Sequence, residues 1–235
     1  MTRTPTSGNG LDSTLTISSE CLGSMAHHKI MSDIIGGRLK PGLRLRVKAL
    51  MESYGVGNSP AREALNQLVG QGLVVRQDHT GFRVAPTSTK ELLEIVTTRC
   101  WLEEIALRKS IRHGDENWEE RIILAHYRLS RAPGPAGVLL LADRLEWEKR
   151  HREFHLTLIS GCGSGILVDY CLELQQRSFR YRNLSSVRTY RNNLDVAEHR
   201  EIHDAVLDRD ADRAVELLAG HYRATVEIFA SEETP

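Results

Sequence analysis

Four histidines in the second half of the chain have the spacing of a metal site. His151 and His155 lie one helical turn apart, so their imidazoles should project from one helix face. His199 and His221 stand on later helical segments, each beside apolar residues that should turn it inward. Imidazoles that converge inside a helical bundle are a common way to hold a divalent metal. The alternative is ordinary surface or hydrogen-bonded histidines, and His203, one turn after His199, could be such a neighbour.

The segment that carries these histidines has helical apolar spacing and no strand-like alternation. Ser88 and Glu91 form a capping box ahead of the first of its helices. Glycine, proline and asparagine breaks separate the later helices from one another. The predicted helices span residues 89–113, 116–131, 138–160, 166–185, 195–207 and 211–229. We therefore predict an all-α antiparallel bundle of about six helices.

A different pattern comes before the bundle. A glycine-bounded turn, Gly55 to Asn58, separates two short helical segments, and the second of these runs from Pro60 to Leu68. Two short apolar runs follow, at residues 73–75 and 82–84, joined by a polar loop. Helix, turn, helix and β-hairpin in this order predict a winged helix-turn-helix, which places one helix in the DNA major groove. The fold class is therefore mainly α, a winged helix followed by the bundle.

The second helix of this unit has the features of a DNA-reading helix. Ser59 is a suitable N-cap, and Pro60 fits the first turn, where no hydrogen bond is lost. Ala61, Leu65 and Leu68 form an apolar stripe, and Arg62 points away from it. A bidentate contact between an arginine and guanine is worth about 1–3 kcal/mol. The alternative for Arg62 is an ion pair with a surface acid.

Charge is unevenly distributed although the chain as a whole is neutral. The 235 residues include 31 basic and 31 acidic side chains, a formal net charge of zero. Residues 25–86 hold nine basic and four acidic residues, a net charge of +5, whereas residues 87–235 hold 21 and 25, a net charge of −4. DNA phosphates bind lysine and arginine. The positive potential is therefore expected where the winged helix is predicted.

The remaining features set the boundaries of the chain. Residues 1–23 are rich in Ser, Thr and Gly and are predicted to be a flexible tail, with a first helix from Met25 to Ile35. The winged helix is assigned to residues 24–86 and the bundle to residues 87–231. No apolar run reaches the ~20 residues that span a membrane, and no signal pattern is present, so we expect a cytoplasmic protein. The four cysteines show no paired spacing and are interpreted as free thiols.

The segment from residue 35 to 84 resembles the DNA-binding domain of the GntR family of transcriptional regulators. The matching residues are Pro41-Gly42, Gly55-Val56, Ser59-Pro60-Ala61-Arg62-Glu63-Ala64-Leu65, Gly72-Leu73-Val74 and Gly81. The resemblance implies DNA contacts at Lys48, Gly57, Asn58, Ser59, Arg62, His79, Thr80 and Gly81.

The chain departs from the GntR pattern at four positions, two of them among these contacts and two at the start of the preceding helix. Asn58 stands where the family usually has arginine, and Thr80 where a basic residue is frequent. Asparagine can read adenine with two hydrogen bonds, so the preferred operator should shift. Arg46 and Val47 replace the usual capping residues of the second helix.

Residues 87–229 resemble the helical effector-binding domain of the FadR-type GntR subfamily, in the branch that binds a divalent metal. The matching pieces are Arg99-Cys100-Trp101-Leu102-Glu103, Phe154-His155-x-x-Leu158, Glu198-His199-Arg200 and His221. The family's ligands, one aspartate and three histidines, correspond to position 151, His155, His199 and His221. Here position 151 is His151, and an all-imidazole site favours zinc or nickel over calcium or magnesium. Glu148, on nearly the same helix face as His155, could supply a carboxylate instead.

The resemblance also implies a function. A small organic acid would bind at the metal, with Arg99 pairing with its carboxylate, although a salt bridge from Arg99 to Glu103 is an equal alternative. The expected protein is a homodimeric repressor that binds a palindromic double-stranded operator. Two other classes are open: a metal-dependent hydrolase that uses the histidine cluster, and a winged helix that binds a protein partner and no DNA.

Overall fold

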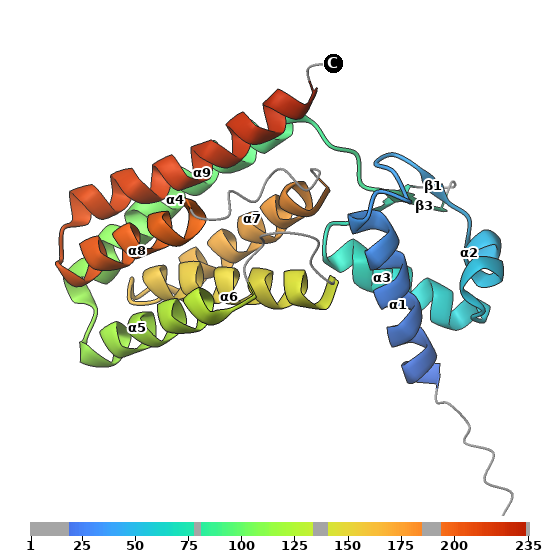
Figure 1. The fold of residues 1–235 in the computed structure, drawn as a ribbon, viewed down its shortest axis with the longest axis horizontal. Helices are drawn as coiled ribbons and strands as arrows, with labels where there is room; N and C mark the ends of the chain where they lie inside the picture. Colours follow the sequence, from blue (N-terminus) through green and yellow to red (C-terminus); the bar gives the residue numbers. More distant parts are fainter. Residues whose placement is uncertain (1–18, 78–80, 134–140, 185–193, 234–235) are drawn as a thin grey trace, which may run out of the picture.

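The computed structural model describes residues 19–77, 81–133, 141–184 and 194–233, which form a winged helix and a helical bundle (Figure 1). The two parts lie next to each other, and the ends of two bundle helices, α6 and α7, face the winged helix. The predicted fold class, mainly α with a winged helix-turn-helix before an all-α bundle, is confirmed.

The winged helix combines three helices with a small antiparallel sheet. Its elements in chain order are α1 (Ser19–Ile35), β1 (Arg44–Leu45), α2 (Val47–Tyr54), α3 (Asn58–Gly70), β2 (Val74–Gln77) and β3 (Gly81–Val84). The strand order is β1-β3-β2, with Leu45 opposite Phe82 and Val74 opposite Val84. Residues 78–80, which include the predicted contacts His79 and Thr80, lie outside the described residues.

The apolar stripe of α3 forms the centre of the winged-helix core. Ala61, Leu65 and Leu68 are fully buried, as predicted, and α1 packs against α3 with the buried side chains of Ile30 and Ile34. Burying one such side chain stabilises a fold by about 1.5–3 kcal/mol. This packing holds the opposite face of α3 toward solvent.

Two local predictions for this part are corrected, and one strand was not predicted. Helix α1 begins at Ser19, so residues 19–23 belong to it and not to the tail. Helix α3 begins at Asn58, and its N-cap is the extended residue Gly57, so the prediction of Ser59 as N-cap is wrong. The two-residue strand β1 was not predicted, because two residues are too few to show alternation. Helix α2 has Arg46 at its N-cap with no side-chain cap, as its sequence indicates.

Six helices within the described residues form the bundle. They are α4 (Thr89–His113), α5 (Glu116–Arg131), α6 (Leu141–Ile159), α7 (Gly165–Leu184), α8 (Leu194–Leu207) and α9 (Ala211–Glu233). The bounds of α4 and α5 are those predicted, because caps define their starts. The side chain of Ser88 accepts the Glu91 N–H at 3.4 Å, and Asp115 accepts the Trp118 N–H at 2.9 Å.

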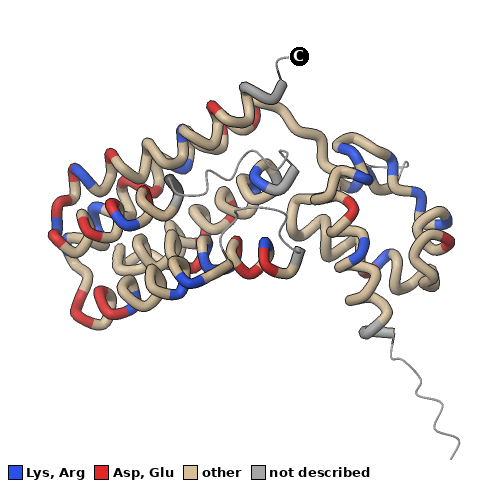
Figure 2. Tube along the Cα trace, in the orientation of Figure 1, with Lys and Arg blue, Asp and Glu red and all other residues tan. Residues whose placement is uncertain are grey.

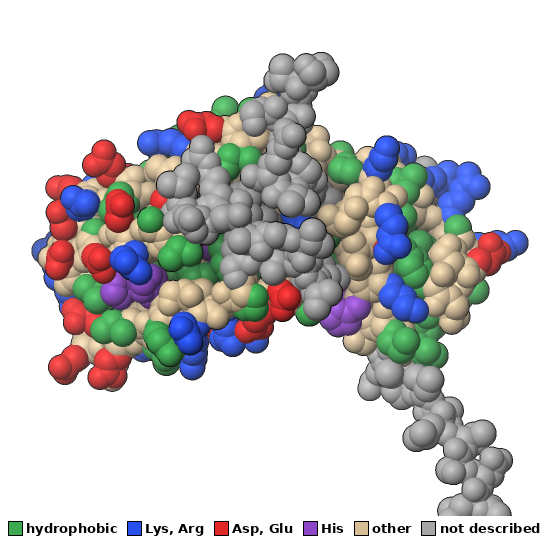
Figure 3. All heavy atoms as spheres, viewed as in Figure 1, with side chains coloured by type: hydrophobic (Ala, Val, Ile, Leu, Met, Phe, Trp, Pro, Cys, Tyr) green, Lys and Arg blue, Asp and Glu red, His purple; other side chains and the backbone are tan. Residues whose placement is uncertain are grey.

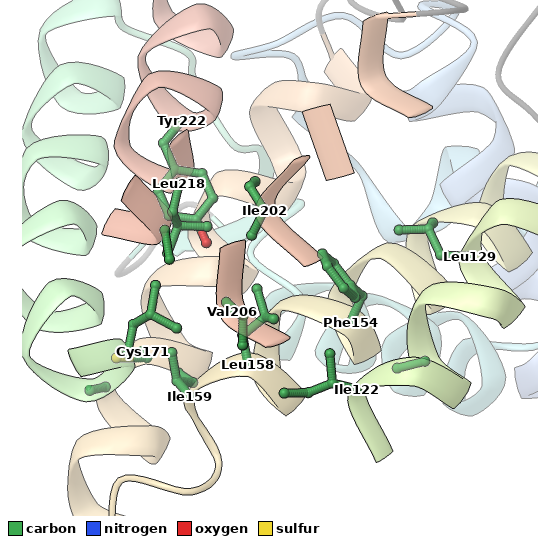
Figure 4. Close-up of a cluster of buried hydrophobic side chains, with 14 of the residues drawn as sticks. Ile122, Leu129, Phe154, Leu158, Ile159, Cys171, Ile202, Val206, Leu218 and Tyr222 are labelled. Carbon is green, nitrogen blue, oxygen red and sulfur yellow. The ribbon is translucent and has the colours of Figure 1, made fainter. Parts of the chain in front are cut away.

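A single apolar core runs through the bundle. Figure 4 shows Phe154, Leu158, Ile202 and Val206, from α6 and α8, directed toward one another. Of the cysteines whose side chains are described, all are free thiols, as predicted, and Cys171 is buried in this core. No helix among the described residues is long and apolar enough to cross a membrane.

Candidate metal centre and DNA-reading surface

The bundle brings together all four histidines that the sequence singled out. His151 and His155 project from α6, His199 from α8 and His221 from α9. One ring nitrogen of each lies within 4.8 Å of the others. The first three side chains are buried, and His221 is nearly so. Among the described residues, these four histidines are the group whose side chains could together bind a metal ion.

The distances within the cluster fit the ligand shell of one ion. Nε2 of His155 lies 3.1 Å from Nε2 of His151 and 3.2 Å from Nε2 of His199. Nε2 of His151 lies 3.4 Å from Nε2 of His221. Four nitrogens at about 2.0–2.1 Å from a tetrahedral zinc stand roughly 3.3–3.4 Å apart. The three separations given above are close to this spacing, and all four nitrogens lie within 4.8 Å of one another.

Outer hydrogen bonds assign the protonated nitrogen of two rings. Nδ1 of His221 donates to Oε2 of Glu198 at 2.8 Å. Nδ1 of His155 donates to the Tyr222 hydroxyl oxygen at 3.1 Å, and that hydroxyl donates to Oε2 of Glu103 at 2.5 Å. When Nδ1 carries the proton, the Nε2 lone pair is free for a metal. Metal-binding histidines are usually oriented by such second partners.

Burial keeps the His151 and His155 imidazoles neutral. Burial, and then the neighbouring histidines, lower the pKa of His151 and of His155 well below its usual range. A neutral ring is the form that binds a metal. The Nε2 atom of each of the four rings lies within 3.4 Å of the Nε2 atom of a neighbouring ring. Such a set of nitrogen donors fits a divalent transition metal.

A buried ion pair is linked to His155 through the Tyr222 hydroxyl. Nε of Arg99 donates to Oε1 of Glu103 at 2.8 Å, and both side chains are at most 3% exposed. The Arg99 guanidinium also lies 3.8 Å from the centre of the Tyr222 ring. The salt bridge that the sequence allows for Arg99 is thus present. Arg99, Glu103, Tyr222 and His155 form one continuous chain of contacts.

A second buried pair lies beside His151. Glu148 accepts hydrogen bonds from Nε and Nη2 of Arg182, the latter at 2.9 Å, and lies outside the histidine group. The carboxylate that the sequence suggested as a substitute ligand is therefore engaged by an arginine. The ring of His151 stacks on Trp147, with ring centroids 4.7 Å apart, and its Nδ1 has no hydrogen-bond partner among the described residues.

His203, the neighbour of His199 that the sequence singled out, lies outside the cluster. His203 stacks on His126 of α5 with ring centroids 4.3 Å apart, and its Nδ1 lies 2.8 Å from Oδ1 of Asp204. The spacing of one turn from His199 does not bring it to the cluster.

The DNA-reading candidates lie on the surface of the winged helix. The side chains or backbone of Lys48, Gly57, Asn58, Ser59 and Arg62 are exposed, on α2, α3 and the turn between them. Nε of Arg62 donates to Oδ1 of Asn58 at 2.9 Å, which holds both side chains at the start of α3. Basic side chains predominate on this part of the molecule, and acidic ones gather on the bundle (Figures 2 and 3).

The wing contributes one described candidate. Gly81 opens β3 with a φ of +92°, a conformation that favours glycine. Arg83 on the same strand donates through Nη1 to the Gly42 carbonyl at 2.5 Å, so it holds the loop before β1 in place.

Sequence reasoning missed the residues that support the histidines. Tyr222, Glu198 and Trp147 each contact a cluster histidine, and Arg182 engages the carboxylate that the sequence offered as a ligand. Tyr222 directly follows His221, but nothing in that adjacency indicates a hydrogen bond to a different histidine. These contacts join helices far apart in the chain, so no local spacing signals them.

Both halves of the chain match known domain families. Residues 22–84 match the family model described as "Bacterial regulatory proteins, gntR family". Residues 94–224 match the model of the FCD domain.

Curated relatives and solved structures agree with this assignment. BphR of Paraburkholderia xenovorans, described as an uncharacterized HTH-type transcriptional regulator, is 34% identical over 85% of this chain and 82% of its own length. GlaR of Escherichia coli, described as an HTH-type transcriptional repressor, is 34% identical over 85% and 92%. The E. coli McbR/YncC structure has a TM-score of 0.62 at 21% identity, over 90% of this chain and 98% of its own. This last likeness concerns the fold alone.

Proposed function

This chain belongs to the GntR family of DNA-binding transcriptional regulators and carries an FCD domain, and we propose that it is a repressor controlled by a small carboxylate. It is a regulator and not an enzyme, and the hydrolase alternative has no support from its relatives. The observation that carries the proposal is the convergence of four imidazole nitrogens in the domain that follows an exposed basic helix.

DNA binding is assigned to the exposed start of α3. Arg62 faces solvent on the side of α3 opposite the buried stripe, so it can reach a guanine edge in the major groove. Lys48 and the backbone at Gly57 flank it and are placed for phosphate contacts. The relative GlaR is described as a repressor, which supports repression, and not activation, as the proposed action of this chain.

The metal proposed for the bundle is zinc or nickel. His151, His155, His199 and His221 would hold it, because four neutral nitrogen donors suit these ions. A metal so held supplies Lewis acidity toward the oxygen of a carboxylate. The chain's own contribution is to orient the rings through Glu198 and Tyr222 and to keep them out of water.

Arg99 remains the proposed cationic contact of the effector. Its guanidinium is held by Glu103, so a carboxylate that reached Arg99 would have to displace the Glu103 carboxylate. Such a displacement would also release the Tyr222 hydroxyl, which donates to the same Glu103. The effector would in this way change the packing between α4 and α9.

Two copies of the chain are needed to read a palindromic operator, because one winged helix buries too little surface for tight binding. Two helices that pack side by side, α4 and α7, expose large apolar side chains. These are Leu93, Trp101, Ile105, Ile166 and Tyr170. We assign this face to a second copy of the chain, in a homodimer related by a two-fold axis.

The proposed function is tested by anisotropy of a labelled duplex that carries the chain's own promoter. Affinity should fall steeply as salt rises, because phosphate contacts release counterions. In zinc-loaded protein, one member of a carboxylate panel from acetate to citrate should weaken operator binding about 5- to 150-fold. The His155→Ala variant should bind the duplex but ignore the carboxylates, whereas His203→Ala should respond like wild type.

Salt-independent binding of the duplex would contradict the DNA assignment. A carboxylate response that survives in His155→Ala would place the effector elsewhere. Sedimentation of a Trp101→Asp variant tests the dimer face, and it should sediment as a monomer where wild type is a dimer.

A further inference from the structure

A cavity of about 200 Å³ lies at the junction of the two domains. One wall is the C-terminal end of the recognition helix α3, at Gly70 and Gln71, together with Met31 of α1. The opposite wall comes from the ends of α6 and α7 that face the winged helix (Figure 1). Leu145 of α6 and Phe179 of α7 also pack against the winged-helix core. The cavity therefore touches both domains where they are already joined.

The cavity has a positively charged side that the protein does not neutralise. Lys149 and Arg152 of α6 line it, and neither has an ion-pair or hydrogen-bond partner among the described residues. The other arginines of the same helix are engaged. Arg150 pairs with two glutamates, and Arg144 donates to the Arg182 carbonyl. Glu148, the acidic residue in the lining, is paired with Arg182.

The rest of the lining is divided between apolar and amide groups. Met31, Leu145 and Phe179 supply apolar surface, and Gln71 and Gln176 supply hydrogen-bonding amides. The volume is below the roughly 300–1,000 Å³ of pockets for drug-sized ligands. A ligand that satisfied this lining would be small, carry one anionic group for the two cations, and have a short apolar body.

We propose that the interdomain cavity is a second ligand site, distinct from the histidine cluster, for a small carboxylate with an apolar body. Arg152 and Lys149 bind the carboxylate, and Met31, Leu145 and Phe179 enclose the apolar part. This goes beyond the proposed function, because the site contains none of the four histidines and does not need the metal.

The position of the cavity gives such a ligand a route to DNA binding. It would contact the C-terminal end of α3, the helix that carries Arg62 near its start, and also α6, where His151 directly precedes Arg152. His27 of α1 reaches the same end of α3, with Nε2 3.0 Å from Oε1 of Gln71. A molecule bound there would therefore fix the orientation of the recognition helix relative to the metal-binding helix.

Calorimetric titration of the full chain with benzoate tests the proposal, with benzamide as a neutral analogue and inorganic phosphate as an anion without an apolar body. Benzoate should bind more tightly than either, both with zinc and after chelation of the metal. Arg152→Gln should weaken benzoate binding about ten-fold or more, since a charged hydrogen-bond partner is lost. Arg150→Gln removes the same charge from a residue of the same helix that does not line the cavity. This variant should leave the affinity for benzoate unchanged.

Three outcomes would overturn the proposal. Equal benzoate affinity in wild type and Arg152→Gln would do so, as would equal affinity for benzoate and benzamide. Benzoate binding that requires zinc and is insensitive to Arg152→Gln would place the ligand at the histidine cluster, which supports the proposed function while removing the second site. A crystal soaked with bromobenzoate would then locate the bromine in one of the two places.

Discussion

The winged helix and the bundle use polar side chains in opposite ways. On α3 the apolar stripe is buried and Arg62 is exposed, so the residues for folding and those for binding are separate. In the bundle the groups for binding are themselves buried, beside the pairs Arg99–Glu103 and Glu148–Arg182. Exposed polar groups are satisfied by water, whereas buried ones need protein partners or a metal. Stability and function should therefore be separable in the winged helix and coupled in the bundle.

The largest effect is expected from two neighbouring glutamates of α4. Glu103 pairs with Arg99 in the buried core, and Glu104 pairs with Arg108 at the surface. Breaking a buried pair leaves a charge without a partner and costs about 3–5 kcal/mol, against roughly 0–1 kcal/mol for an exposed pair. Chemical denaturation of Glu103→Ala and Glu104→Ala measures both. Similar losses in the two variants would contradict the contrast between interior and surface.

The next effect concerns the metal. A ligand that binds only the folded chain stabilises it by about 2.7 kcal/mol at a free concentration one hundred times its Kd. Thermal unfolding of wild type should therefore shift upward with added zinc and return with a chelator. His199→Ala should lose most of this shift. The control is His203→Ala, which changes a histidine that stacks on His126 outside the cluster and should keep the shift. A zinc shift that is equal in both variants would contradict the assigned ligands.

A third effect should appear in binding with no change in stability. Arg62→Ala removes an exposed guanidinium, so operator affinity should fall by about 1–3 kcal/mol per half-site while the denaturation midpoint stays the same. Arg177→Ala on the bundle surface removes the same charge outside the winged helix and serves as the control. If Arg62→Ala lowers stability as much as it lowers affinity, the separation proposed for the winged helix is absent.

The smallest effect is a pH dependence of the metal-free bundle. Burial, and then His203, lower the pKa of His126 to about 4, and the unfolded chain titrates near 6.5. Between these values the unfolded state binds more protons, so stability falls as pH decreases through this window. His151 and His155 act in the same direction. His126→Phe should make the decline shallower, and an unchanged slope would argue against its burial as a neutral ring.

The elements were largely predictable because their signals are local. The capping box at Ser88 and the break before Asp115 define the ends of α4 and α5 within a few residues of sequence. The start of α1 was missed because its first turn lies in a Ser-rich segment, and β1 because it is two residues long.

The candidate site was predictable only in its donors. Histidines are rare and polar, so their placement on inward faces is visible in sequence. The contact between Tyr222 and Glu103 spans 119 positions, and the stacking of Trp147 on His151 depends on side-chain rotamers. Such partners are determined by how the helices pack, which no spacing along one helix reveals. Local patterns therefore identify the candidate ligands, and tertiary structure identifies the residues that orient them.

We propose that the buried imidazoles hold a transition metal, and X-ray absorption of the purified chain would reveal the donors around it. We expect one zinc or nickel per chain, with about four nitrogen donors at roughly 2.0–2.1 Å and the multiple-scattering signature of imidazole. Protein without a metal after zinc is supplied, or a shell made mainly of oxygen donors, would contradict it.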